Sequence, residues 1–433
     1  MVKEAIKRAW EWSGVGMALI VIAIGVGVTM KDQNERESVA NEIASRPTRE
    51  RNLAVFDAAT VLLKTHYYDS KIFTTAGWRK LEAEWRDKAA VSESPLLYLD
   101  VLDSLAHEFP ESHVGFDPPP QRDQADSASA PATHVDYDRA LWGPGFDAPE
   151  IRRALGRPQV IDDVLRGSPA ERAGVTPGWI LVKQHTEVNP DRALYTGEVL
   201  ELAPDASRGA ETTGQWEPHE TVKLEFELEM LPAPPDFETR QLSGGITYLR
   251  FDVFDSPELV EKVLNTIEDA GVAGLILDLR RNPGGRQLHL QRVAGALLGK
   301  ESILGTTRTA NSTTPMASLR FADHFRGPLV ALIGPSTASA AEIAAAAVQD
   351  HKRGKLIGRT TNGSVVLAQW FDLPDGGKMM IPVSDFVRSD GRRIEGAGVE
   401  PDIWILPTLD DVRAGRDPVL ERALREITGM ASL

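Results

Sequence analysis

The segment from Gly327 to Asp350 constrains the fold of this chain most, because a strand sequence in it runs directly into a helix sequence. Residues 327–333 are apolar throughout and predict a short buried strand. Residues 340–350 are rich in alanine and predict a helix, so Ser339 falls at a helix N-terminus. Unpaired backbone N–H groups at such a terminus can stabilise a developing oxyanion. The simpler alternative is that Ser339 and Glu342 only cap the helix.

Strand and helix sequences also alternate before this segment. The pattern predicts a strand at 246–251, a helix at 257–270, a buried strand at 273–279 and an amphipathic helix that ends near Leu298. This alternation predicts an α/β core with a largely parallel sheet, in which the strand ends meet in one crevice. Asn282-Pro-Gly-Gly285 and Ser339 both follow such strands. Gly284 and Gly285 permit close backbone approach to a substrate, although the same tetrapeptide also suits an ordinary turn.

Size and charge limit the classes of protein to consider. A chain of 433 residues with 42% hydrophobic residues exceeds one ordinary core and predicts two or three globular domains. Its formal net charge of -15 argues against a nucleic-acid partner, which favours a basic surface. The absence of cysteine excludes disulfides, thiolate metal sites and a cysteine nucleophile. We expect neither a cofactor nor a metal ion.

The N-terminal region predicts a membrane anchor. Residues 13–30 carry no charge, which reaches the length of a membrane-spanning helix, and Trp10 and Trp12 lie at one edge like an interfacial belt. The excess of Lys and Arg before the span places the N-terminus in the cytoplasm and the rest outside, in the periplasm if the protein is bacterial. A cleaved signal peptide is the alternative, but no convincing Ala-x-Ala site follows the apolar run.

A module with its own motif precedes the α/β core. Residues 160–164 predict a strand, the Ser168-Pro-Ala-Glu-Arg-Ala-Gly174 segment predicts a short helix with a glycine stop, and residues 179–182 predict a second strand. These residues resemble a PDZ domain, a fold that binds peptide ends by strand addition. The resemblance implies a carboxylate-binding loop at Trp142, Gly143 and Gly145. A small β domain without a ligand remains the alternative.

Four motifs in the core occur in the order of a known family. They are residues 278–285, 336–342, 358–363 and 395–403, and they resemble the S41 serine peptidases, which include the C-terminal processing, or tail-specific, proteases and the tricorn core protease. The resemblance implies an α/β core of the ClpP/crotonase type and Ser339 as the nucleophile. It also implies an oxyanion hole made by the amides of Ala340 and one of Gly284 or Gly285.

The general base departs from the usual pattern of the family. Processing proteases carry a lysine directly after the glycine of the Gly-x-x-Thr-x-Gly motif, but Ser364 stands there. The nearby lysines, which we expect to be solvated, are Lys352, Lys355 and Lys378. The pair Ser112-His113 is similar to the tricorn branch and implies His113 as base, with Ser112 as an auxiliary hydrogen-bonding group. In that branch Glu395 would orient the site, while Glu342 would support the helix start.

The sequence therefore predicts several parts and one main function. The parts are an anchor and linker (1–50), a helical domain (51–120), a flexible linker (121–141), a PDZ-like domain (142–232), the protease core (233–409) and a C-terminal helix (410–433). The expected function is a membrane-anchored serine endopeptidase that cleaves proteins or peptides near tails bound by the PDZ-like module. A homo-oligomer is possible. An inactive peptide-binding pseudoprotease and a crotonase-type acyl enzyme remain alternatives.

Overall fold

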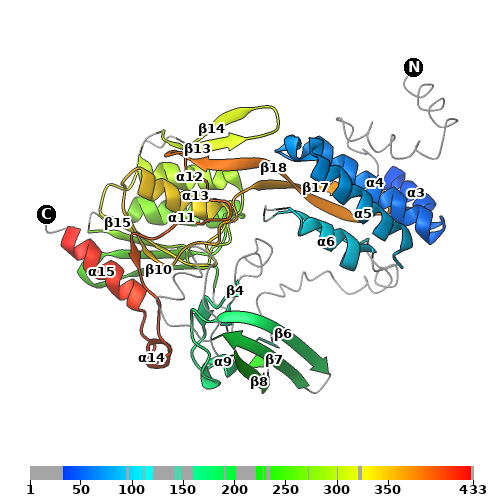
Figure 1. The fold of residues 1–433 in the computed structure, drawn as a ribbon. Helices are drawn as coiled ribbons and strands as arrows, with labels where there is room; N and C mark the ends of the chain where they lie inside the picture. The colour runs from blue at the N-terminus through cyan, green and yellow to red at the C-terminus, as the bar shows by residue number, and fades with distance from the viewer. Residues whose placement is uncertain are drawn as a thin grey trace. The chain divides into compact units, whose positions relative to one another are not determined.

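The structure is a computed structural model, and it divides the chain into two compact units (Figure 1). It describes residues 33–93, 97–109, 111, 113–119, 142–143, 146–147, 159–189, 192–200, 221–227, 229–230, 235–271, 273–299, 301–319 and 324–430. The first unit contains the chain up to Ala132 together with residues 308–313 and 366–385. The second unit contains the remainder.

The first unit is helical with a small antiparallel sheet. Its helical elements are α3 (Gln33–Ala44), α4 (Thr48–His66), η1 (Ser70–Thr74), α5 (Ala76–Val91), the π-helical turn η2 (Leu97–Leu102) and α6 (Asp103–Ala106). Strand β18 (Lys378–Arg388) pairs with β1 (Gly115–Asp117) on one side and with β17 (Leu367–Asp372) on the other. The Thr75 hydroxyl caps α5 by accepting from the Trp78 amide at 3.1 Å.

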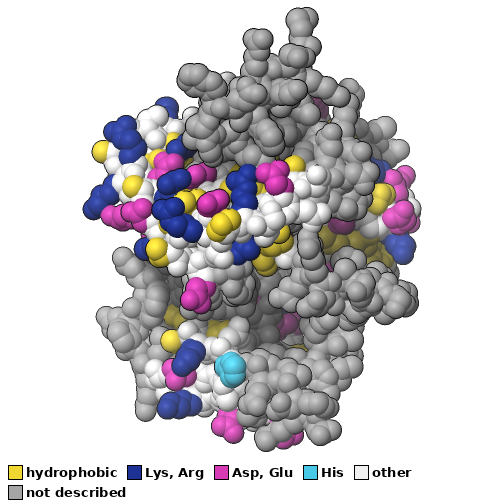
Figure 2. Space-filling model, turned by 90° about the vertical axis from the view of Figure 1, so that its right-hand side faces the viewer, with side chains coloured by type: hydrophobic (Ala, Val, Ile, Leu, Met, Phe, Trp, Pro, Cys, Tyr) yellow, Lys and Arg dark blue, Asp and Glu magenta, His cyan; other side chains and the backbone are white. Residues whose placement is uncertain are grey.

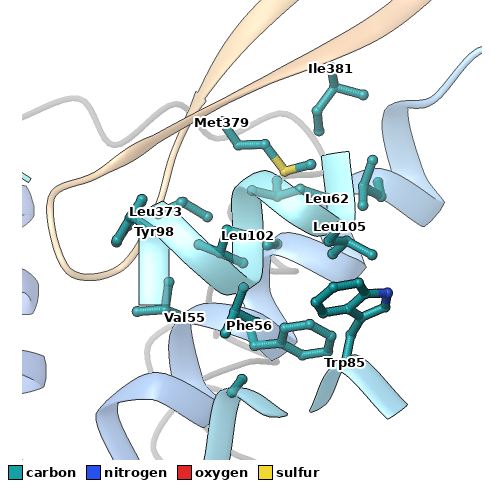
Figure 3. Packing of buried hydrophobic residues seen from close by; sticks show 14 of the residues in the cluster. Val55, Phe56, Leu62, Trp85, Tyr98, Leu102, Leu105, Leu373, Met379 and Ile381 are labelled. Atoms are coloured by element: carbon teal, nitrogen blue, oxygen red, sulfur yellow. The ribbon is translucent and has the colours of Figure 1, made fainter. Parts of the chain in front are cut away.

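The core of the first unit joins segments that are far apart in the sequence. Phe56 of α4, Trp85 of α5 and Leu105 of α6 pack with Met379 and Ile381 of β18 (Figure 3). Each of these side chains is at least nine-tenths buried. Residues 366–385, which the sequence assigned to the protease core, thus complete the hydrophobic core of the helical unit.

The second unit begins with a β module. Strands β4 (Gln159–Val160), β6 (Ile180–Asn189), β7 (Arg192–Leu200) and β8 (Thr221–Glu227) form an antiparallel sheet in that order. The helix α9 (Pro169–Arg172) starts at Ser168, whose hydroxyl accepts from the Glu171 amide at 3.1 Å. Two further short ladders pair β2 (Trp142–Gly143) with β9 (Glu229–Met230), and β3 (Phe146–Asp147) with β5 (Asp163–Val164). The predicted strand at 160–164 is therefore divided between β4 and β5.

A six-stranded sheet forms the rest of the second unit, in the order β10 (Phe237–Gln241), β11 (Thr247–Phe251), β12 (Leu275–Asp278), β15 (Leu329–Ile333), β16 (Lys355–Gly358) and β19 (Ile403–Trp404). Only β10 pairs antiparallel, so the predicted largely parallel sheet is confirmed. Strands β13 (Ile303–Arg308) and β14 (Thr313–Ala317) lie outside this sheet and are neighbours of each other.

Helices cover both faces of the parallel sheet (Figure 1). Helices α11 (Pro257–Asp269), α12 (Gln287–Leu298) and α13 (Ala340–Asp350) pack beside one another on one face. On the other face, Ile427 of α15 (Pro418–Met430) packs with Ile276 and Val330. The remaining helix, α14 (Leu409–Ala414), precedes α15. Burial on both faces explains why these strands read as continuous apolar runs.

The predicted anchor at residues 13–30 and the linker at 121–141 lie outside the described residues. None of the helices in the described parts of the chain is long and apolar enough to cross a membrane. On the face shown in Figure 2, Lys and Arg side chains lie among Asp and Glu side chains.

Candidate active site

Ser339 has an unusual backbone conformation. It lies between β15 and α13, is half-buried, and has φ 52° and ψ -121°. A non-glycine residue with positive φ is sterically disfavoured, and such strain is concentrated at functional sites. Ser339 also forms a capping box with Glu342, but an N-cap residue normally has extended backbone. Capping therefore accounts for the polar residue types at 339 and 342 and leaves the strained backbone unexplained.

The loop of Gly284 and Gly285 packs directly against Ser339. A Cβ atom placed on Gly284 would lie 2.6 Å from the Cβ of Ser339 and 2.9 Å from the Ala340 nitrogen. A Cβ on Gly285 would lie 2.7 Å from the backbone of Phe254. Both residues have positive φ, at 107° and 133°. Glycine is thus required at both positions for the close approach that the sequence predicted.

The hydrogen bonds distinguish the two glycine amides. The Gly284 amide donates to the side-chain oxygen of Asn282 at 2.9 Å. Among the described residues, the amides of Gly285 and Ala340 donate to no protein acceptor. Two such amides beside a serine can stabilise a developing oxyanion. The geometry therefore favours Gly285 over Gly284 as the partner of Ala340, and it gives Gly284 a steric role.

The carboxylate of Glu342 joins the Ser339 turn to the segment 361–364. It is fully buried and accepts from the Ser339 amide at 3.0 Å. It also accepts from the Thr361 hydroxyl at 2.5 Å and from the amides of Gly363 and Ser364 at 2.7 and 2.8 Å. Because four donors converge on one carboxylate, Glu342 holds the backbone of two motifs together. The sequence had predicted only a supporting role at the helix start.

A second buried carboxylate lies close to the first. Glu395 is 5% exposed and accepts from the Val365 amide at 2.6 Å. Its neighbour Gly396 donates to the Gly363 carbonyl at 2.8 Å. Burial raises the pKa of Glu342 to about 7, and the negative charge of Glu395 adds to this rise. All four sequence motifs therefore meet around Ser339, held in part by two neighbouring acidic groups.

Ser364 occupies the position where the family pattern has lysine. Its carbonyl accepts from the Ser339 amide at 2.9 Å, so position 364 does lie beside the candidate nucleophile. The Ser364 hydroxyl is buried and donates to the Asn362 side chain at 2.7 Å. Lys355, one of the nearby lysines, forms an ion pair with Glu426 at 2.7 Å.

The β module contacts the turn before Ser339 through Asp162. The Asp162 carboxylate accepts from the Ser336 amide at 2.9 Å. The guanidinium of Arg359, which is 3% exposed, lies 3.3 Å from the same carboxylate and donates to the Asp162 carbonyl at 2.8 Å. This junction explains the break between β4 and β5, because residues 161 and 162 turn toward the α/β core. No sequence motif marked Asp162.

The structure does not test the other predicted site residues. His113 is half-buried and belongs to the first unit, so its pairing with Ser339 stays a prediction. Ser112 and Gly145 lie outside the described residues. Trp142 and Gly143 form β2. In the described part of the chain, no group of three or more His, Asp or Glu side chains is placed to hold a metal ion.

Comparison with known sequences finds relatives of the core. Residues 245–405 match the family model of peptidase family S41. The carboxyl-terminal-processing protease of Synechocystis sp. is 28% identical over 280 residues, which cover 61% of this chain and 64% of that protein. The carboxy-terminal-processing protease of Bartonella bacilliformis is 27% identical over 278 residues, with 60% of each chain covered. The matches thus span less than two thirds of these relatives.

Solved structures agree on the fold. The photosystem II D1 C-terminal processing protease has a TM-score of 0.57 over 82% of this chain and 93% of its own, at 21% identity. The tricorn protease has a TM-score of 0.50 over 88% of this chain and 37% of its own, at 17% identity. At these identities the likeness shows the mixed α/β fold of the core.

The buried pair of carboxylates makes a prediction about stability. The pKa of Glu342 is raised from 4.5 to about 7, so between these values the folded protein holds a proton that the unfolded chain releases. The resulting stabilisation is present below about pH 4.5 and is lost as the pH rises through about 7. We expect urea unfolding to show that the stability of the native protein falls across this range relative to Glu342→Gln. Parallel pH profiles of the two proteins would contradict this.

The junction at Asp162 makes a second prediction. Asp162→Ala removes the carboxylate that faces the buried Arg359 and Ser336, and we expect it to lower the free energy of unfolding by about 1–3 kcal/mol. The matched control is Asp163→Ala, because Asp163 is the exposed neighbour, and its expected loss is below about 0.5 kcal/mol. Equal losses in urea unfolding would show that the junction contributes no specific stability.

Proposed function

We propose, from the match of residues 245–405 to the family model of peptidase family S41, that this chain is a serine endopeptidase with Ser339 as nucleophile. The observation that carries the proposal is the strained Ser339 backbone at the start of α13, together with the amides of Gly285 and Ala340, which donate to no acceptor in the described part of the chain. Attack by the Ser339 hydroxyl on a peptide carbonyl would form a tetrahedral oxyanion within reach of the Gly285 and Ala340 amides.

His113 is the proposed general base. A base must take the proton of Ser339 and transfer it to the leaving amine, and an imidazole suits both steps near neutral pH. Two findings support a general base other than the side chain at position 364. The Ser364 side chain carries a hydroxyl in place of an amine, and that hydroxyl is bonded to Asn362. In the proposed site Glu395 orients the imidazole, and Ser112 is an auxiliary hydrogen-bonding group.

The substrates are proposed to be protein or peptide tails. The β module contains an antiparallel sheet and the capped helix α9 that its PDZ-like motif predicts, and strand addition to such a sheet would bind an extended peptide. The uncharged residues 13–30 are the proposed membrane anchor, with the catalytic part on the extracytoplasmic side. The relatives named above are processing proteases, which supports a role in C-terminal processing.

The pseudoprotease alternative rests on the missing lysine at position 364. If this alternative holds, the protein binds peptide tails without cutting them, so substitution of Ser339 or His113 has no cleavage rate to change. The crotonase-type alternative gives Ser339 no role as a nucleophile, so the strained backbone at that residue argues against it.

Cleavage of unfolded β-casein tests the proposed chemistry. Ser339→Ala should lower the rate at least about 10³-fold, because the nucleophile is lost. His113→Ala should lower kcat by about 10²–10⁴-fold, the usual range for a general base. Ser364→Ala is the matched control, and we expect less than about a threefold change because its backbone makes the contacts with Ser339 and Glu342.

Three outcomes would count against the assignment. A native protein that binds β-casein and does not cleave it supports the pseudoprotease. Full activity of His113→Ala removes that residue as base. A large loss of cleavage rate in Ser364→Ala would indicate that the general base lies in the segment that contains Ser364.

A further inference from the structure

A buried carboxylate in the first unit lies two residues before His113. Glu111 is 5% exposed, and its two oxygens accept hydrogen bonds from two consecutive tyrosines. The Tyr67 hydroxyl donates to one oxygen and the Tyr68 hydroxyl donates to the other at 2.7 Å. Both tyrosines are at least nine-tenths buried. We call these three residues the tyrosine clamp.

The clamp is attached to regular structure on two sides. Tyr67 directly follows α4, and its amide donates to the Leu63 carbonyl at 2.9 Å. The Tyr68 amide donates to the carbonyl of Pro382 in β18 at 3.0 Å. Because one end of the clamp is held by a helix and a strand, the position of the Glu111 side chain is fixed by the hydrophobic core of the unit.

The hydrogen bond from Tyr67 in the clamp does not depend on pH in the range where histidine titrates. Burial, followed by the hydrogen bond to Glu111, raises the pKa of Tyr67 well above its ordinary value. Tyr67 therefore remains a hydroxyl donor throughout the range in which a histidine titrates. The Tyr67 ring also packs against Phe109, with ring centroids 5.3 Å apart. The segment that leads to His113 is thus held at both Phe109 and Glu111.

Burying a carboxylate costs free energy that an apolar side chain would not. The helical unit could close its core with apolar residues at position 111, as it does at the nearby Leu105 and Phe109. A carboxylate held by two oriented donors instead restrains the position and direction of the backbone at residue 111. The residue that gains most from this restraint is His113, since a catalytic group must be held within a fraction of an ångström of its productive position.

We propose that Glu111, held by Tyr67 and Tyr68, is a positioning residue for His113. The inference rests on the proposed function, in which His113 is the general base. The clamp does not contact substrate. It restrains the backbone at Glu111, two residues before His113, so that the imidazole of His113 is presented in one orientation. Loss of the clamp lets the imidazole sample unproductive orientations.

The test replaces the donors and keeps the side-chain volumes. In Tyr67→Phe/Tyr68→Phe, both hydroxyls are lost and the rings remain in the core. We expect kcat for casein cleavage to fall at least about tenfold with KM nearly unchanged, because substrate binding does not involve the clamp. Tyr98→Phe is the matched control. The hydroxyl of Tyr98 is also buried and donates to a carboxylate, that of Asp375, at 2.8 Å in the same unit. It should keep the native kcat.

A double-mutant cycle decides whether the clamp acts through His113. In the His113→Ala background, the two tyrosine substitutions should cause no further loss of rate, because the group that they position is already absent. Rate losses that multiply would show that the clamp acts by another route and would overturn the proposal. A rise in KM that accounts for the whole loss would overturn it as well.

The same set of variants separates this proposal from the proposed function. If His113→Ala cleaves at the native rate, the base assignment fails and the clamp proposal fails with it. If His113→Ala is slow while Tyr67→Phe/Tyr68→Phe matches Tyr98→Phe, the proposed base stands and the clamp is only structural.

Discussion

The rest of the candidate site depends on the hydrogen bonds that the buried carboxylate of Glu342 accepts. It accepts from the Ser339 amide and from three donors in the segment 361–364. A buried carboxylate requires such donors, since an unsatisfied buried charge is far more costly than a paired one. The same four bonds hold the backbone of Ser339 in a conformation that a serine would not otherwise adopt. Helix start and strained turn are thus stabilised by a single side chain.

The parallel sheet supplies the framework for this interaction. Strands β12 and β15 are neighbours in register, so the loop of Gly284 and the turn of Ser339 emerge at the same sheet edge. On the opposite side of the sheet, α15 is joined to the end of β12 through Arg280, which contacts Asp278 at 2.6 Å and Asp417 at 2.8 Å. Asp162 adds a contact from the β module to the turn before the nucleophile. The elements that hold Ser339 therefore come from widely separated parts of the chain.

Because the contacts around Ser339 come from separated parts of the chain, only some of them could be predicted from the sequence. The alternation of strands and helices carries a periodic signal, and it correctly predicted α13 and the meeting of Gly284 with Ser339. The contacts of Glu342 and Asp162 depend on loops that lie beside them only after folding, so no local pattern marks them. For the same reason, nothing in residues 366–385 indicated that they complete the core of the helical unit. The roles of Ser339, His113 and Glu395 stay predictions.

The most direct test of whether Ser339 is the nucleophile is to identify the residue to which an active-site label attaches. A fluorophosphonate reacts covalently with a serine whose hydroxyl is activated and whose oxyanion is stabilised. Mass spectrometry of the digested, labelled protein should find the adduct on Ser339, in the peptide that joins β15 to α13. An adduct on another serine, such as Ser336 or Ser364, or no adduct on native protein that cleaves casein, would contradict the account.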